Sequence, residues 1–442
     1  MPHFVSLRPD AALIPLPWAT PLDAWPDDML VALPRGLSRH VVKFIGVGDA
    51  IYAAKEINAE TARHEFQMLT DLNRLGQPAV EPVGIVTDRV DDEGLPLDDV
   101  LLTRHLQFAL PYRSLFTRGM RHDTVTRLLD ALVVLVVRLH LVGFMWGDIT
   151  LSNVLFRRDA ETFSAYLVDA ETGELYNRLS NGQRRYDIDN GMTNIFGDFL
   201  DLQAGGFLDS SLDPANLVKL IETRYRELWA ELTVTEEFSG TDLGRIEHRV
   251  RRLNALGFDV AELDIDASLD DRIKIRPVVV EPGHHSRRLM RLTGLDTEEN
   301  QARRLLSDLD SYRARAGLQH VDESIAAHQW LTRVFEPVLA AIPPELQDKR
   351  ESAQLYHELL DYRWFQAQRE SRDVPLDEAL PGYINDVLMR LPDEVLPAVV
   401  SPADQPSDDE EPVPEDPWDI ALESAPQVST LDRAALLARK KK

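Results

Sequence analysis

The feature that most constrains the fold is a helix that is apolar almost all the way round, followed directly by a polar loop. The segment 123–142 places apolar residues on nearly all sides of a helix and contains the run ALVVLVV at 131–137. A helix without a polar face is buried as the core of a lobe. The run is shorter than the roughly 18 to 20 residues that a membrane-spanning helix needs. The polar loop is therefore expected at the edge of a buried helical core, where catalytic residues are commonly found.

Three polar residues follow this helix in a fixed order. Asp148 and Asn153 are five residues apart in HLVGFMWGDITLSNVLF (140–156), and Asp169 comes sixteen residues later in YLVDAETGE (166–174). Two short strands are expected between them, at 153–156 and 165–169. The alternative is that Asp148 and Asn153 are turn residues that close a helix–strand connection, since such residues often have this role.

This ordered loop resembles the protein-kinase-like superfamily, including its aminoglycoside phosphotransferase and lipopolysaccharide kinase branches. The resemblance spans residues 28–232 and implies an α+β, bilobal kinase-like fold with a small β-rich N-lobe and a helical C-lobe. It implies that Asp148 is catalytic and accepts the proton of an acceptor hydroxyl. It also implies that Asn153 and Asp169 bind Mg²⁺, which prefers hard oxygen ligands. The implied cofactors are ATP and Mg²⁺.

An upstream lysine and glutamate extend the same resemblance. YAAK at 52–55 is similar to the V-A-I-K strand motif, which implies that Lys55 holds the α- and β-phosphates of the nucleotide. The pattern at 59–75 predicts a helix that stops at Gly76. This helix offers Glu65 as the ion-pair partner of Lys55, with Glu60 as the alternative. Taken singly, each of these charges is more typical of a solvated surface, since such side chains usually face water.

The loop expected to cover the phosphates is LPRGLSRH at 33–40. Gly36 permits a close approach of the backbone, and Ser38, Arg39 or His40 offers contacts to phosphate oxygens. GVGD at 46–49 is instead expected to be a hairpin turn, because no third glycine follows and the next element is a strand.

Several positions depart from the pattern of regulated protein kinases. Trp146 replaces the usual His, Ala170 and Glu171 replace the Phe and Gly of D-F-G, and no A-P-E signature follows. These departures favour a small-molecule or glycolipid kinase. Glu171 is either an extra metal ligand or a solvated acid. Asp187 or Asp189 is expected to brace the catalytic loop from beneath or to cap a helix.

The chain is expected to have five parts. These are an N-terminal extension at 1–27, the N-lobe at 28–108, the C-lobe at 109–232, a mostly helical domain at 233–397 and a disordered acidic tail at 398–442. Strands of the N-lobe are predicted at 28–33, 40–45, 50–57, 80–86 and 99–106. The whole layout resembles lipopolysaccharide-kinase-like proteins that carry a domain of unknown function, DUF4032. The tail is expected to be disordered because 401–432 holds ten acidic residues, no basic residue and many prolines.

Charge and composition limit the other function classes. The 442 residues include 74 acidic and 48 basic side chains, for a net charge of −26, which disfavours binding to nucleic acid or to an anionic membrane. The absence of cysteine excludes disulfides, thiolate zinc sites and cysteine nucleophiles. The N-terminus has no secretory signal pattern, so the expected location is the cytoplasm.

One basic region contrasts with the negative net charge of the whole chain. Residues 272–291 hold six basic residues and one acidic residue, directly after an acidic run at 259–271. Together with Arg245, Arg249 and Arg252, this region predicts either an anion site or pairing with the acidic run. The adjacent pair His284 and His285 is not spaced for a metal. The aromatic residues of the following helices are expected in the core: Trp330, Phe335, Tyr356, Tyr362, Trp364 and Phe365.

These patterns predict an ATP- and Mg²⁺-dependent phosphotransferase that acts on a hydroxyl of a small molecule, a sugar or a lipid-linked glycan. The alternative is a pseudokinase, a nucleotide-binding scaffold that recruits a protein partner through its acidic tail. A third hypothesis, nucleic-acid binding through the arginine cluster, is weaker. No motif identifies the acceptor.

Overall fold

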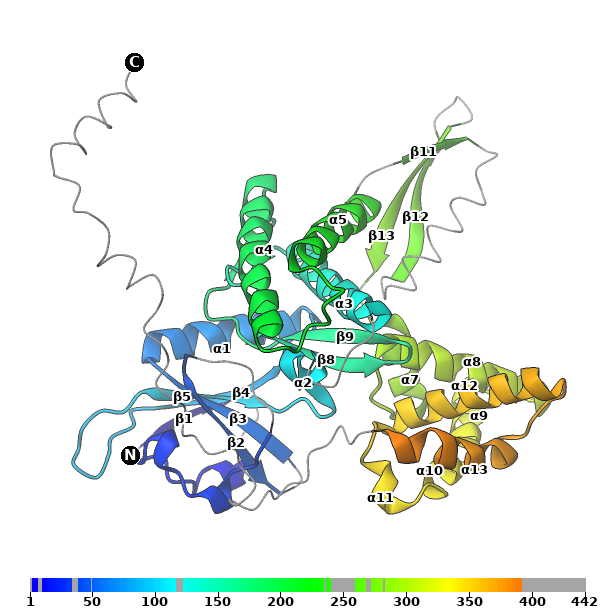
Figure 1. Cartoon of the computed structure of the whole chain (residues 1–442), viewed down its shortest axis with the longest axis horizontal. Coiled ribbons are helices and arrows are strands. Elements are labelled where there is room, and N and C mark those ends of the chain that lie inside the picture. The colour runs from blue at the N-terminus through cyan, green and yellow to red at the C-terminus, as the bar shows by residue number, and fades with distance from the viewer. Residues whose placement is uncertain are drawn as a thin grey trace. The chain divides into compact units, whose positions relative to one another are not determined.

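The computed structural model divides the chain into two compact units, Met1–Leu396 and Pro397–Lys442, and the described residues all lie in the first. The described residues are 2–6, 10–33, 39–48, 50–116, 122–233, 236–239, 259–267, 272–280 and 283–391. The expected acidic tail therefore lies outside them. The first unit is a mixed α+β structure, with a sheet in its N-terminal region and helices in its C-terminal part, as the kinase-like resemblance predicts (Figure 1).

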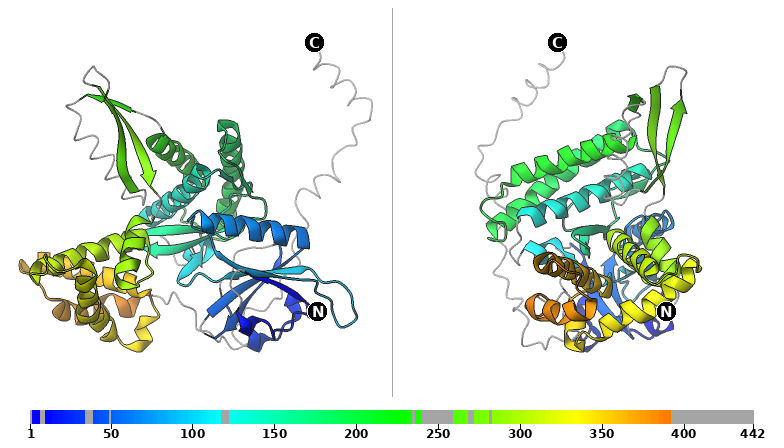
Figure 2. Two further views of the ribbon diagram at one scale, coloured as in Figure 1. Left: turned by 180° about the vertical axis from the view of Figure 1, so that it is seen from behind. Right: turned by 90° about the vertical axis from the view of Figure 1, so that its right-hand side faces the viewer.

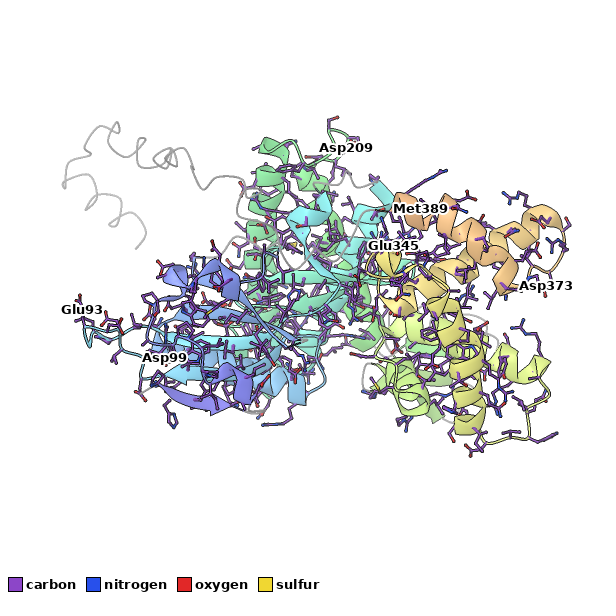
Figure 3. The ribbon with its side chains drawn as sticks, turned by 90° about the horizontal axis from the view of Figure 1, so that it is seen from below. Glu93, Asp99, Asp209, Glu345, Asp373 and Met389 are labelled. Carbon is purple, nitrogen blue, oxygen red and sulfur yellow. The ribbon has the colours of Figure 1, made fainter. Side chains whose placement is uncertain are left out.

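A five-stranded antiparallel sheet forms the N-terminal layer, in the order β1-β4-β5-β3-β2. Its strands are β1 (His3–Ser6), β2 (Val41–Val47), β3 (Ala50–Ile57), β4 (Glu81–Thr87) and β5 (Asp99–Arg104). Four of the five predicted strands are confirmed, and β2 and β3 are joined through Gly48 as the predicted hairpin. The loop between β4 and β5 extends away from the sheet, with Glu93 at its tip (Figure 3).

The strand predicted at 28–33 is wrong. Its first residues form a 3₁₀ turn, Asp27–Met29, because Pro26 fixes the backbone before two acidic residues that favour turns. Only Leu30 bridges to Ile45 of β2. The fifth strand is instead β1, from the predicted N-terminal extension, which pairs with β4.

The rest of the N-terminal segment packs on the sheet as well. This segment contains short 3₁₀ turns at Ala11–Leu13 and Leu22–Ala24. Four of its side chains are buried in one hydrophobic core with residues of the sheet: Leu13, Trp18, Leu22 and Trp25 pack with Ile45, Val86, Val100 and Leu102. Arg89 is fully buried, donates to the carbonyls of Trp18 and Thr20 at 2.9 and 2.7 Å, and pairs with Glu56. These contacts fix the N-terminal segment to the sheet.

Helix α1 (Ala59–Arg74) packs against β4 and β5. Asn58 caps it by accepting a hydrogen bond from the Thr61 backbone N–H at 3.0 Å. Leu69 and Leu72 are fully buried in a core that also contains the residues of α3. After the helix, the chain pairs with β9: the Leu167 N–H donates to the Pro78 carbonyl at 3.0 Å, and the Val80 N–H donates to the Leu167 carbonyl at 2.9 Å.

The following part is mainly helical, with two small sheets at its edge. Its helices are α2 (Tyr112–Phe116), α3 (His122–Leu141), α4 (Asn181–Ala204) and α5 (Pro214–Thr233). Its strands are β6 (Ala109–Pro111), β8 (Val154–Asp159) and β9 (Thr162–Leu167) in one sheet, and β7 (Phe144–Met145) with β10 (Glu174–Leu175) in another. The expectation that α3 is a buried helix is confirmed. Helix α5 packs on both α3 and α4, and the three helices lie side by side (Figure 2).

A three-stranded antiparallel sheet follows, where the sequence had indicated mostly helix. Its strands are β11 (Glu236–Ser239), β12 (Asp259–Ala267) and β13 (Arg272–Val280), in the order β11-β13-β12. The strands form because DVAELDIDA alternates and RIKIRPVVV is rich in β-branched residues. The register sets the acidic strand against the basic one: Asp264 is opposite Arg276, and Asp266 is opposite Lys274.

The last described part is helical and has its own cores. It contains α7 (His284–Thr293), α8 (Glu299–Arg315), α9 (Glu323–Trp330), α10 (Glu336–Ala340), α11 (Pro344–Gln347), α12 (Ser352–Glu370) and α13 (Leu376–Asp386), with a π-turn at Leu331–Phe335 and a 3₁₀ turn at Leu388–Arg390. Among the described helices, none is long and apolar enough to span a bilayer.

The predicted aromatic core of this helical part is confirmed only in part. Trp330, Phe335 and Tyr356 are buried and pack on one another. The prediction is wrong for Trp364 and Phe365, which are 52% and 65% exposed. They lie on the last turns of α12, whose buried residues end at position 360.

The helical part is joined to the β8–β9 hairpin by buried polar contacts. Arg157 of β8 pairs with Glu298 at 3.2 Å and also with Glu351. The Gln354 side chain donates to the Ala160 carbonyl at 3.1 Å. The β8–β9 hairpin, which follows the loop of Asp148 and Asn153, is therefore joined to the N-terminal ends of α8 and α12.

Candidate functional site

A cavity of about 280 Å³ lies where the five-stranded sheet meets the helical part that follows it. It contains every described residue that the sequence singled out as catalytic, nucleotide-binding or metal-binding: Arg39, Lys55, Glu65, Asp148, Asn153 and Asp169. Gly36 and Ser38 lie outside the described residues. Residues separated by more than a hundred positions in the sequence thus line one cleft.

Lys55 on β3 is the centre of the charged part of the cleft. Its ammonium group donates to Glu65 at 3.0 Å, to Asp169 at 2.7 Å and to Glu171 at 3.3 Å. Burial by itself would lower the pKa of Lys55, but the three carboxylates outweigh burial and raise it. Lys55 is therefore a fixed positive charge at any pH near neutrality.

Glu65, rather than Glu60, is the partner of Lys55. It lies on the sheet side of α1 and is 1% exposed, whereas Glu60 is exposed in the first turn. Burial and the charge of Asp169 raise the pKa of Glu65 to about 7, although Lys55 opposes this shift. The Ala170 N–H also lies 3.4 Å from the carboxylate of Glu65. Glu65 therefore connects β3 to the segment that carries Asp169.

The carboxylate of Asp148 is oriented by two amides. Asn153 donates its side-chain N–H to Oδ2 of Asp148 at 3.1 Å and also lies 3.1 Å from the Asp148 backbone carbonyl. Asn194, on α4, donates to Oδ1 of Asp148 at 3.0 Å. Both carboxylate oxygens of Asp148, a residue that lines the cleft, are therefore held in position by amide donors. Asn194 was not predicted, because it lies 46 residues from Asp148 and belongs to no motif in the sequence.

Asp187 braces this loop from within the core, and Asp189 does not. The carboxylate of Asp187 accepts hydrogen bonds from the backbone N–H groups of Trp146 and Gly147 at 2.9 and 2.7 Å, and lies 2.9 Å from His140 Nε2. It is 0% exposed, whereas Asp189 is exposed on the same helix. The two N–H groups belong to the residues just before Asp148, so Asp187 fixes the start of the loop that carries Asp148.

Gly147 is required at its position by the backbone. It has a φ of +80°, and an added Cβ would lie 2.9 Å from the Thr172 carbonyl oxygen. The tight turn at Gly147 lets Asp148 line the cleft only two residues after the buried Trp146. Trp146 in turn donates its ring N–H to the Asp169 carbonyl at 2.9 Å. The residue that replaces the kinase His therefore ties the loop to the Asp169 segment.

Glu171 is not the solvated acid that the sequence offered as one alternative, because only 12% of its side chain is exposed. It accepts hydrogen bonds from Arg39 at 2.9 Å and from Lys55 at 3.3 Å, and it lies 3.0 Å from His40 Nε2. Arg39 and His40 adjoin the predicted phosphate loop. Basic groups from two sides of the cleft therefore converge on the carboxylates.

Three carboxylates have the chemistry of a divalent-cation site. Glu65, Asp169 and Glu171 each offer an oxygen atom, and these atoms lie within 4.8 Å of one another. Hard oxygen ligands at such spacing fit Mg²⁺. Asn153 lines the same cavity, and its contact with Asp148 uses the side-chain N–H and not the amide oxygen, which is the atom that would bind a cation. All three carboxylates also accept hydrogen bonds from Lys55, so a cation would compete with the ammonium group for their oxygen atoms.

In the basic region at 272–291, side chains are described only from His284 onward, so the choice between an anion site and pairing with acids stays a prediction. Glu299 lies 2.7 Å from His285 Nδ1 and accepts backbone N–H bonds from His285 and Ser286 at 3.0 and 3.1 Å. The ring of His284 lies edge-on to that of His285. These contacts join the first turn of α7 to an acid that lies outside the acidic run at 259–271. Arg245, Arg249 and Arg252 lie outside the described residues.

Comparisons with known proteins agree with this organisation. Residues 49–190 match the family model of the lipopolysaccharide kinase (Kdo/WaaP) family, and residues 227–388 match that of a domain of unknown function, DUF4032. The predicted resemblance is therefore confirmed in both parts of the chain. No curated protein matches the sequence. A solved structure titled "WaaP in complex with acyl carrier protein" is 15% identical, covers 52% of this chain and 90% of its own, and has a TM-score of 0.32.

Proposed function

We propose that this chain is an ATP- and Mg²⁺-dependent phosphotransferase whose acceptor is a hydroxyl of a small molecule, a sugar or a lipid-linked glycan. The observation that carries the proposal is the contact of Lys55 with both Glu65 and Asp169, in the same cleft as Asp148. Phosphoryl transfer needs little covalent chemistry from a protein, so catalysis depends on positioning and charge. A lysine, two acids and an oriented carboxylate supply both.

The cavity has an apolar half and a charged half. Val42, Ala53, Leu101, Leu155 and Val168 are apolar residues of its lining, which suits a nucleobase. On the charged side, a bound triphosphate would replace carboxylates as the partner of the Lys55 ammonium group. Arg39, whose side chain is 79% exposed, contacts Glu171, as does His40. If Glu171 turned toward a bound cation, Arg39 could turn toward the phosphate oxygens. We infer that this exchange accompanies nucleotide binding.

The metal and the base use different carboxylates and share Asn153. Asp169 and Glu171, with Asn153 as the further ligand implied by the resemblance, would hold Mg²⁺, which neutralises the charge that develops on the transferred phosphate. Asp148 would accept the proton of the attacking hydroxyl while Asn153 and Asn194 hold its carboxylate in place. Asn194 is therefore a positioning residue in this proposal.

Calorimetry of ATP binding tests the nucleotide site. The full chain is expected to bind ATP with Mg²⁺, and Asp169→Ala is expected to weaken binding at least tenfold, or about 1.4 kcal/mol. Asp189→Ala, on the exposed face of α4, is the matched control and should leave binding unchanged. Absence of Mg²⁺-dependent ATP binding, or equal affinities for the Asp169→Ala variant and the unaltered chain, would refute the proposal.

ATP turnover distinguishes the enzyme from the pseudokinase alternative. Asp148→Asn should lower ATP turnover by about a hundredfold or more while ATP still binds, because it removes the base but keeps the shape of the side chain. ATP binding by the unaltered chain without any turnover, across hydroxyl-bearing acceptors, would favour the nucleotide-binding scaffold instead.

The acidic segment 401–432 suggests a protein partner. A segment with ten acids and no base favours a basic surface on that partner. Pull-downs with the full chain and with a chain ending at residue 396 should differ in a captured protein whose retention falls as salt is added. Identical captures would remove the tail as the site of contact.

A further inference from the structure

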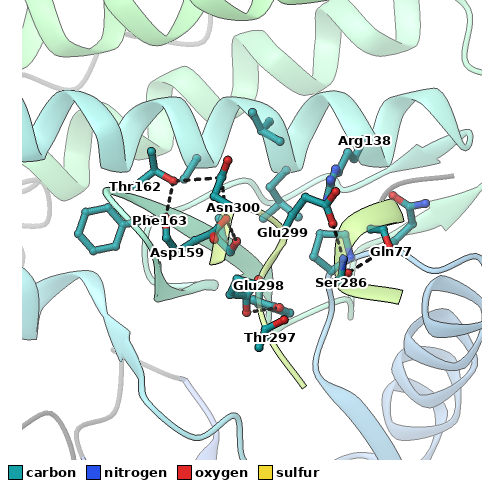
Figure 4. A pocket seen from close by; sticks show the side chains of 18 of the residues that line it. Gln77, Arg138, Asp159, Thr162, Phe163, Ser286, Thr297, Glu298, Glu299 and Asn300 are labelled. Atoms are coloured by element: carbon teal, nitrogen blue, oxygen red, sulfur yellow. Dashed lines mark hydrogen bonds between the residues drawn. The ribbon is translucent and has the colours of Figure 1, made fainter. Parts of the chain in front are cut away.

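A second cavity, of about 560 Å³, lies away from the cleft of Lys55 and Asp148 and shares no lining residue with it. Its walls are the loop after α1, one side of α3, strand β9 and the first turns of α7 and α8 (Figure 4). It therefore lies between the part of the chain that matches the lipopolysaccharide kinase family and the part that matches DUF4032.

Two buried oxygen atoms of the lining have no hydrogen-bond partner within the described part of the chain. They are Oε1 of Gln77 and Oγ1 of Thr297, on residues that are only 7% and 6% exposed. The Gln77 amide nitrogen donates to the Leu75 carbonyl at 2.9 Å, so Oε1 remains an acceptor. Buried polar atoms are normally hydrogen-bonded, and the cavity is far larger than the roughly 30 Å³ that one bridging water occupies. The two atoms therefore point to a ligand that carries hydrogen-bond donors.

The charged side chains of the lining are matched within the protein. Four of them lie next to a partner outside the lining: Glu298 is 3.2 Å from Arg157, Glu299 is 2.7 Å from His285, Asp130 is 3.7 Å from Arg224 and Arg127 is 3.5 Å from Asp123. Arg138 lies beside Glu299, whose negative charge acts on it (Figure 4). Arg287 and Asp296, which have opposite signs, are both exposed to solvent. The lining thus has no clear excess of either charge.

Asp159 is the remaining acid of the lining. It accepts hydrogen bonds from the Gln301 backbone N–H at 2.9 Å and from the Asn300 side chain at 2.8 Å. Burial and the charge of Glu298 raise the pKa of Asp159, which favours its neutral form. A charged ligand in a buried site needs an opposite charge to offset the loss of its hydration. Since the charges here are already matched, the cavity favours a ligand without net charge.

The lining offers hydrogen-bond donors and acceptors together with an apolar surface. Guanidinium groups such as that of Arg138 only donate, Gln77 Oε1 only accepts, and the Thr297 hydroxyl does both. A hydroxyl group of a ligand fits beside either kind, because it also donates and accepts. The apolar residues of the lining suit the C–H face of a small ring: Pro78, Ala79, Val134, Leu135 and Phe163.

We propose that this cavity binds a neutral polyhydroxy compound of about the size of one sugar ring, with hydroxyl groups against Gln77 and Thr297. Such a ligand would bind whether or not the chain transfers phosphate in its other cleft, because the two cavities have separate linings.

A thiol placed in the cavity tests this preference, because the chain has no cysteine of its own. Met290→Cys, on the α7 wall and 40% exposed, supplies the attachment point. The variant is equilibrated with four thiols and their disulfides: 1-thio-β-D-glucose, cyclohexanethiol, cysteamine and 3-mercaptopropionate. Mass spectrometry measures each mixed disulfide at a fixed ratio of thiol to disulfide. Ser307→Cys, on the exposed face of α8, is the control that corrects for the different reactivities of the thiols and for the general acidity of the chain.

The expected result is a thioglucose adduct that is favoured by about fivefold or more over each of the other three, relative to Ser307→Cys. Every other order overturns the proposal. Cyclohexanethiol in first place would show an apolar void, cysteamine or mercaptopropionate would show a site for an ion, and equal adducts would show a cavity that holds only water.

Adding Gln77→Leu and Thr297→Val to Met290→Cys should lower the preference for thioglucose to about twofold or less, because both oxygen atoms without a partner are gone. A preference that survives this change would also overturn the proposal. Thermal unfolding checks that each variant is folded. Ala131→Cys, on the α3 wall, takes the same four thiols and replaces Met290→Cys if that variant folds poorly.

Discussion

Replacing Asp187 should destabilise the chain more than replacing any other acid of α4. The carboxylate is fully buried and accepts the N–H groups of Trp146 and Gly147 at 2.9 and 2.7 Å, with His140 as a third neighbour. In Asp187→Ala, two buried N–H groups lose their acceptor. Each orphaned donor costs roughly 1–3 kcal/mol, so the variant should lose about 2–6 kcal/mol of unfolding free energy. That is a large share of the roughly 5–15 kcal/mol typical of a domain.

Urea denaturation followed by tryptophan fluorescence measures this loss, and Trp146 lies directly at the altered site. Asp189→Ala is the matched control, because it removes an exposed carboxylate from the same helix two residues away and should cost less than about 0.5 kcal/mol. Asp187→Asn keeps one oxygen acceptor and should fall between the two. A loss below about 1 kcal/mol for Asp187→Ala, or equal losses for the two alanine variants, would refute the bracing role.

Two further predictions follow from buried charges. Burial raises the pKa of Glu65 to about 7, and only the ionised form of Glu65 holds Lys55, so ATP turnover should rise as the pH passes through about 7. Glu65→Gln should lower ATP turnover and remove this rise from the pH profile. A rise that persists in Glu65→Gln would contradict the assignment. Arg157→Met leaves Glu298 and Glu351 buried without their cation, so unfolding free energy should fall by about 3–5 kcal/mol at pH 8. The loss should be smaller at pH 6, because burial already raises the pKa of Glu351 to about 7 and protonation removes its charge; a loss independent of pH would argue against this account.

The sequence predicted those parts of the site that lie within one loop or one sheet–helix unit. Asp148 and Asn153 are neighbours in a single turn, and Lys55 and Glu65 lie on consecutive elements, so their spacing alone brings them together. Asn194 was missed because its contact with Asp148 depends on how closely α4 packs against the loop. That approach is possible only at Gly191, where an added Cβ would lie 2.7 Å from Ile149. Packing distances of this kind have no local pattern in a sequence.

Fold prediction failed where two patterns competed. The composition of 28–33 is typical of a strand, but Pro26 and the two acids after it place a 3₁₀ turn at Asp27–Met29 instead. The hairpin of β12 and β13 was hidden because its acidic and basic runs suggested charge function rather than strand pairing, although the register sets one run against the other. In both cases, whether the segment forms a strand depends on a partner strand elsewhere in the chain, which the residue types of the segment itself do not indicate.

The burial of α1 has a consequence for regulation. In protein kinases, the position of the helix that bears the glutamate partner is a point of control. Here Leu69 and Leu72 belong to the same core as α3, and moving the helix away would expose both, at about 1.5–3 kcal/mol each. The pair of Lys55 and Glu65 is thus assembled by folding itself. In the phosphotransferase that we propose, this pair would need no activating modification, and turnover would follow the supply of nucleotide and acceptor.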